Sequence, residues 1–202
     1  RTAPLSGTEH LVSHLLDMRA AAAGGATALH GAQVGVASVL AATIWHDTLD
    51  TFDPRALNRS GVADDPASVE RRVRDAFAPL DPTGRMADEC WRDVKRKIER
   101  WSSKEPEIRA FAADWDRHRT ALRELVAPPE RLRDALIAAG APSTVGELEP
   151  PAGASVVRWA LTALPLMRDR FTVTDLRFLA GDWEAASIDR LLFASGVMGP
   201  AA

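Results

Sequence analysis

Apolar side chains recur at three- and four-residue spacing along most of the chain, and this is the spacing of one face of an α-helix. Between positions 86 and 104, five apolar residues share one stripe: Cys90, Trp91, Val94, Ile98 and Trp101. The segment 171–174 has the composition of a short strand, but Thr172 or Thr174 equally well caps a following helix. The pattern therefore predicts an all-α fold, a multi-helix bundle.

Glycines, prolines and polar clusters mark where the predicted helices end. Helices are predicted over 6–23, 31–51, 67–80, 86–104, 106–127, 130–139, 155–167, 172–180 and 185–194, with a short helical turn at 143–148. Ser6 and Glu9 fit a capping box at the first helix. We expect a single helical domain over 1–202, with a helix pair in 1–52, an irregular connection in 53–66 and the remaining helices in 67–202.

The predicted helix 106–127 is expected to turn one apolar face to the core. That face consists of Ile108, Phe111, Trp115, Leu122 and Leu125. The tryptophans of this region are spaced as core residues, so we interpret them as packing groups and not as a stacking platform for bases.

Composition and charge exclude several classes of function. The 202 residues include 25 basic and 28 acidic ones, a net charge of −3, and the two signs are mixed along the chain. No basic surface for nucleic acid is therefore expected. One cysteine, Cys90, cannot form a disulfide framework, which predicts a reducing, cytoplasmic compartment. The chain begins at Arg1 without a leader-like segment, so we expect no secretory signal and interpret the chain as part of a longer protein.

The segment 20–45 contains no Asp, Glu, Lys or Arg and is long enough to span a bilayer. Its apolar character is interrupted by two glycines, by His30 and by Gln33. Because polar groups are costly inside a membrane, we expect two buried elements that break at the glycines and no membrane span.

Histidines near the start of the chain are candidates for a metal site. His10 and His14 lie four residues apart on one face of the first predicted helix, and His30 stands where the second helix begins. A helical hairpin brings His30 back against His10, and imidazoles of this kind suit zinc or iron. Glu9 and Asp17 are candidates for a third ligand. The alternative is that the helix histidines are partly exposed and that His30 only forms a hydrogen bond at a helix start.

Three segments carry a resemblance to a known family. They read SGTEHLVSH at 6–14, ALHGAQVGV at 28–36 and MRDRFTVTDL at 167–176. In this order they resemble the C-terminal helical domain of the sn-glycerol-1-phosphate dehydrogenases, which are members of the iron-containing alcohol dehydrogenase and dehydroquinate synthase-like superfamily. The resemblance extends over essentially the whole chain and is densest in these segments.

The resemblance implies part of a metal-dependent, NAD(P)-linked oxidoreductase of phospholipid metabolism, which interconverts dihydroxyacetone phosphate and sn-glycerol 1-phosphate. His10 and His30 resemble the two histidine ligands of the catalytic metal, Zn²⁺ or else Fe²⁺ or Ni²⁺. His14 resembles the family's second histidine, which lies beside the substrate and passes a proton. The third ligand, an aspartate, and the Rossmann-like N-terminal half that binds NAD(P)H are expected upstream. We find no glycine-rich dinucleotide motif here, assign no cofactor-binding residue, and expect this part to be inactive alone.

Other features keep alternative functions open. Ala32 stands where the family commonly has Glu, which favours a sibling polyol dehydrogenase or cyclase on the same scaffold. The expected absence of the cofactor half favours a stand-alone, non-catalytic helical interaction module. Arg168 and Arg170 are candidates for binding a substrate phosphate, or are solvated charges at a helix end. A homo-oligomer also stays open.

Overall fold

The computed structural model describes residues 7–58 and 61–199, and within these ranges every regular element is helical. The α-helices are α1 (Thr8–Ala22), α2 (His30–Thr51), α3 (Pro66–Phe77), α4 (Arg85–Ser103), α5 (Glu105–Ala113), α6 (Trp115–Leu125), α7 (Pro129–Ala138), α8 (Ala154–Ala163), α9 (Val173–Leu179) and α10 (Ala185–Ser195). Short 3-10 turns are η2 (Pro54–Asn58), η3 (Val62–Asp64), η4 (Val145–Glu147) and η5 (Leu164–Leu166). The predicted all-α fold is confirmed.

The helix pair α1 and α2 separates at the predicted glycines. Gly24 has a left-handed φ of +67°, a conformation that glycine adopts without a steric penalty. The amides of Gly24 and Gly25 donate to carbonyls in the last turn of α1 at 3.0 and 2.9 Å, a double hydrogen bond that ends many helices. At the other end of α1, the predicted capping box depends on Ser6, which lies outside the described residues; the N-cap is Gly7.

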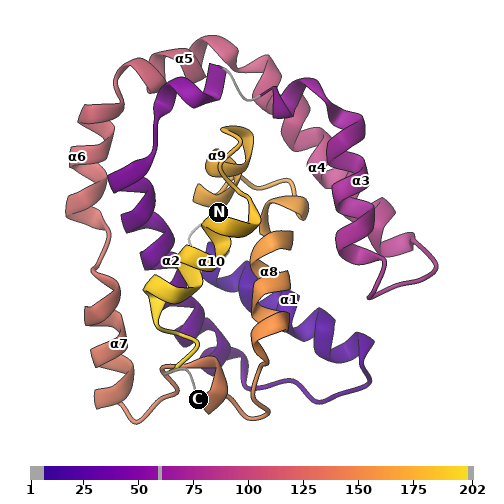
Figure 1. The fold of residues 1–202 in the computed structure, drawn as a ribbon, viewed down its shortest axis with the longest axis vertical. Helices are drawn as coiled ribbons and strands as arrows, with labels where there is room; N and C mark the ends of the chain where they lie inside the picture. Colours follow the sequence, from indigo (N-terminus) through magenta and orange to yellow (C-terminus); the bar gives the residue numbers. More distant parts are fainter. Residues whose placement is uncertain (1–6, 59–60, 200–202) are drawn as a thin grey trace.

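Helices α1, α2, α8 and α10 pack together and place the largest core between them. Helices α3 and α4 form a pair on one side, α6 and α7 follow α2 on the other, and α5 runs between the two sides (Figure 1). Residues of α1, α2, α8 and α10 in this core are fully or almost fully buried: Leu11, Leu15, Val39, Ile44, Leu161 and Leu191. Burial of these side chains therefore sets how α1 lies against α2.

The uncharged segment 20–45 is divided between two helices, as its glycines predict. Val39 and Ile44 of α2 are fully buried in the core, so the apolar character of this helix serves packing. Among the helices of the described ranges, none combines the length and the apolar character that crossing a membrane requires.

The prediction of one continuous helix over 106–127 is wrong. The structure has two helices here, α5 and α6, which meet at Asp114. Trp115 is buried and packs edge-on against Phe52, with ring centroids 5.1 Å apart. A break at Asp114, a residue of modest helix propensity, turns α6 toward α2 and permits this contact. The single apolar face expected for a continuous helix is therefore interrupted, and Leu125, predicted to be inside, is 80% exposed.

The predicted helix 155–167 is also too long. Its α-helical part, α8, ends at Ala163, and the chain continues as the 3-10 turn η5. Pro165 lies within that turn and lacks the N–H that an α-helix needs, so the helix cannot continue in the same form.

The family-like segment at 167–176 supplies one partner of a buried ion pair. Lys97 of α4 binds the carboxylate of Asp175 and donates to the carbonyl of Pro165 at 2.9 Å. Thr172 is the N-cap of α9, and its amide and hydroxyl each donate to Asp175 at 2.8 Å, so 171–174 begins a helix and forms no strand. Burial raises the pKa of Asp175, while Lys97 and Thr172 oppose that rise.

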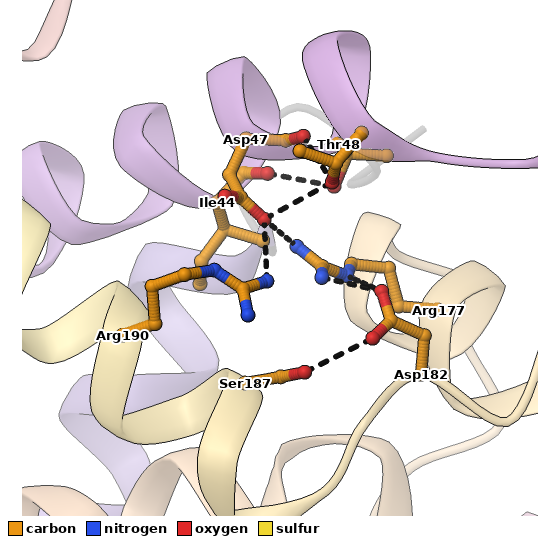
Figure 2. A network of polar contacts seen from close by, with 8 residues as sticks. Ile44, Asp47, Thr48, Arg177, Asp182, Ser187 and Arg190 are labelled. Carbon is orange, nitrogen blue, oxygen red and sulfur yellow. Dashed lines mark hydrogen bonds and ion pairs between the residues drawn. The ribbon is translucent and has the colours of Figure 1, made fainter.

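A second buried cation joins the end of α2 to α9 and α10 (Figure 2). The guanidinium of Arg177 is fully buried, binds Asp47 of α2, and donates from Nε to Asp182 at 3.1 Å. Asp47 also accepts from Arg190 of α10 at 3.4 Å. Burial disfavours the charge on Asp47, but the hydrogen bonds from Arg177 and Arg190 outweigh it and lower the pKa of Asp47 below its ordinary value.

Candidate metal centre

The structure brings the three N-terminal histidines together between α1 and α2. His10 and His14 are one turn apart on α1, and His30 is the first residue of α2. The ring centroid of His30 lies 5.3 Å from that of His10 and 5.9 Å from that of His14. His14 and His30 are exposed and His10 is half-buried, so the cluster is open to a ligand.

Two of these rings have a partner at Nδ1. The Nδ1 of His30 is 2.9 Å from the hydroxyl of Ser13, and the Nδ1 of His10 is 3.3 Å from the carboxylate of Glu9. Partners of this kind, on the nitrogen away from the metal, orient histidine ligands in metalloproteins. A ligand bond to either ring would therefore use its Nε2 atom.

The separation of His10 and His30 fits a pair of ligands to one ion. Because a Zn–N bond is about 2.0–2.1 Å, two imidazoles on one tetrahedral zinc have ring centroids roughly 5 Å apart. The observed 5.3 Å meets this condition. Within the described ranges no group of three or more His, Cys, Asp or Glu side chains is arranged to hold a metal ion, so the described residues bring two candidate imidazoles together without completing a metal site.

His14 differs from the other two rings in its electrostatic surroundings. Burial lowers the pKa of His14 from its ordinary value, and the positive charge of Arg168 lowers it further, with smaller contributions from the neighbouring imidazoles. Asp17 opposes these effects. A lowered pKa favours the neutral imidazole, which is the form that can accept a proton. Arg168 is exposed and has a left-handed φ of +58°, which is uncommon outside glycine.

Glu9 and Asp17, the candidates for a third ligand, are engaged elsewhere. Glu9 contacts His10 at Nδ1, and Asp17 accepts from the side-chain amide of Gln33 at 3.0 Å. Sequence reasoning overlooked Ser13 and Gln33, which are buried between the helices and hydrogen-bonded to each other at 2.5 Å. A signal was available, because Gln33 is a polar residue one turn from His30 on α2.

Comparisons with known proteins support the resemblance seen in the sequence. No family model matches the chain, and no solved structure matches it. The chain is 42% identical over 101 residues to a glycerol-1-phosphate dehydrogenase (NAD(P)⁺) of Natronomonas pharaonis. The match covers 50% of this chain and 22% of the length of that relative. The predicted resemblance is thus confirmed over half of this helical chain, which is similar there to a glycerol-1-phosphate dehydrogenase, and its extension over essentially the whole chain stays a prediction.

Proposed function

We propose that this chain is the helical, metal-contributing part of an NAD(P)-linked oxidoreductase that interconverts dihydroxyacetone phosphate and sn-glycerol 1-phosphate. The observation that carries the proposal is the convergence of His10 and His30 from successive helices at a distance suited to one ion. The similarity to a glycerol-1-phosphate dehydrogenase supplies the reaction. A nicotinamide-binding domain and a further metal ligand are provided outside the residues described above.

His10 and His30 would hold a divalent cation, Zn²⁺ or else Fe²⁺ or Ni²⁺, through their Nε2 atoms. When bound, such a cation supplies Lewis-acid polarisation of the substrate carbonyl. His14, neutral and next to His30, accepts or returns the proton of the substrate hydroxyl. Arg168, which is exposed and whose positive charge lowers the pKa of His14, would attract the substrate phosphate.

The natural polypeptide that carries this chain provides the test of the reaction. Incubated with Zn²⁺, dihydroxyacetone phosphate and NADH or NADPH, it is expected to oxidise the nicotinamide and to form sn-glycerol 1-phosphate. Absorbance at the reduced-nicotinamide band and chiral analysis of the product measure the two outcomes. Turnover of dihydroxyacetone or glycerol in place of the phosphate esters favours the sibling polyol dehydrogenase that Ala32 suggests. No turnover with Zn²⁺, Fe²⁺ or Ni²⁺ supports a non-catalytic module.

Substituting His14→Asn tests the role of the third imidazole. We expect kcat to fall by about 100-fold or more, the size of a general acid–base contribution, because asparagine cannot carry the proton. Zinc content should stay unchanged, since His14 is not one of the proposed ligands. The matched control is His118→Asn: His118 stacks on Phe111 of α5, with ring centroids 4.9 Å apart, and has no place in the cluster. A kcat as low in the control as in His14→Asn contradicts the assignment.

A further inference from the structure

We propose that Ser13, Gln33 and Asp17 form a directional hydrogen-bond chain that fixes the tautomer of His30 and leaves the lone pair of its Nε2 free for a metal ion. Three bonds make the chain: Asp17 Oδ1 to Gln33 Nε2 at 3.0 Å, Gln33 Oε1 to Ser13 Oγ at 2.5 Å, and Ser13 Oγ to His30 Nδ1 at 2.9 Å. The link to a divalent cation rests on the proposed function, but the tautomer itself does not.

The direction of the chain follows from its carboxylate end. The carboxylate of Asp17 only accepts, so the amide atom of Gln33 that faces it is the NH₂ group. The carbonyl oxygen of Gln33 must then face Ser13, whose hydroxyl donates its single proton to it. Having no proton left for the imidazole, the Ser13 oxygen accepts from Nδ1–H of His30. Neutral His30 therefore carries its proton on Nδ1 and none on Nε2.

Burial keeps water from reversing the donor and acceptor roles along this hydrogen-bond chain. Ser13 is 0% exposed and Gln33 is 4% exposed, whereas His30 is exposed. The two middle members thus exchange hydrogen bonds only with protein groups, and a break at either one leaves a buried polar atom without a partner. The end that faces solvent is the imidazole, which is the end that a cation can reach.

The hydrogen-bond chain also joins α1 and α2, the two helices that carry the candidate ligands. Ser13 lies on α1, one turn from His10, and Gln33 lies on α2, one turn from His30. The same contacts that choose the tautomer therefore hold the two imidazoles in one relative position. Ser13, Gln33 and Asp17 are positioning residues, since they act on the ion through His30.

Nitrogen NMR of the natural polypeptide that carries this chain, labelled with ¹⁵N at histidine and freed of metal, reads the tautomer directly. At pH 8 the neutral ring of His30, assigned from its loss in His30→Ala, is expected to show a protonated Nδ1 and an unprotonated Nε2. In Ser13→Ala and in Gln33→Met, the constraint is lost and we expect the proton to move largely to Nε2. Circular dichroism checks that both variants are folded.

The matched control is Ser38→Ala, on the same helix as His30. The hydroxyl of Ser38 donates to the carbonyl of Val34 at 2.8 Å and has no contact with the chain. We expect the wild-type tautomer in this variant. A proton on Nε2 of His30 in the wild-type protein, or an unchanged tautomer in folded Ser13→Ala, overturns the inference.

Zinc titration of the same proteins tests the link to the metal. Zn²⁺ affinity is expected to fall by about 10–100-fold in Ser13→Ala, as is typical when the partner of a metal-bound histidine is removed, and to be unchanged in Ser38→Ala. Wild-type affinity in Ser13→Ala overturns the positioning role. If wild-type protein binds no Zn²⁺ while its tautomer is as expected, the proposed metal centre fails and the tautomer assignment stands.

Discussion

Replacing Arg177 with methionine is expected to lower the free energy of unfolding by about 3 kcal/mol, in the range measured when one partner of a buried ion pair is removed. The guanidinium is fully buried and binds Asp47 and Asp182. Without it, both carboxylates lose their buried cation, although Asp47 keeps its contact with Arg190 and Asp182 keeps the hydrogen bond from the hydroxyl of Ser187. Because the side chain of Asp182 is 43% exposed and that of Asp47 is 19% exposed, water compensates them in part, which places the loss at the lower end of that range. Urea denaturation, followed by circular dichroism, measures it.

Arg190→Met is the matched control, because Arg190 binds the same oxygen of Asp47 as Arg177 does. Its side chain is 50% exposed, and exposed ion pairs contribute less than about 1 kcal/mol. We therefore expect a small loss in this variant, with the dependence of unfolding on urea unchanged. If both variants lose the same free energy of unfolding, burial of the Arg177 guanidinium does not add to its contribution to stability.

Substituting both His10 and His30 with alanine is expected to weaken Zn²⁺ binding by more than about 100-fold. Removing only the hydrogen-bond partner of a metal-bound histidine lowers metal affinity by about 10–100-fold, and this variant removes two proposed ligands themselves. Isothermal titration of the natural polypeptide that carries this chain, together with metal analysis after dialysis, measures the affinity and the retained zinc.

Two other histidines supply a control with the same number of imidazoles removed. His46 lies 3.3 Å from the carbonyl of Ala127, and His118 stacks on Phe111, so neither belongs to the cluster. The double variant His46→Ala, His118→Ala is expected to keep its zinc. Full zinc occupancy in the His10→Ala, His30→Ala variant would be the result that removes the metal centre from this site.

Helix positions were largely predictable because the residues that end the helices act locally. Gly24 permits a left-handed turn after α1 whatever the rest of the chain does, and the amphipathic stripe of α4 depends only on spacing within one helix. The break at Asp114 was not predictable in this way. It accompanies the contact between Trp115 and Phe52, which are far apart in the sequence, and a tertiary contact of this kind leaves no mark in the local pattern of residues.

The grouping of the three candidate imidazoles was predictable, but the groups that contact His30 from behind were not. Four-residue spacing places His10 and His14 on one face, and a hairpin brings His30 to them. The contact of Ser13 with Gln33 depends on how α1 and α2 are rotated about their axes, which the sequence pattern does not specify. The partners of Arg177 come from α2 and from the turn before α10, so only the folded chain brings them together.

Helix α2 carries a residue of the histidine cluster at one end and a residue of the Arg177 network near the other. His30 is its first residue and Asp47 lies in its last turns, about 25 Å away at a rise of about 1.5 Å per residue. Between these two residues, α2 is packed into the apolar core, which holds the helix in place along its length. The orientation of the His30 ring is consequently set by the packing of α2 in the core together with the hydrogen bond from the ring to Ser13.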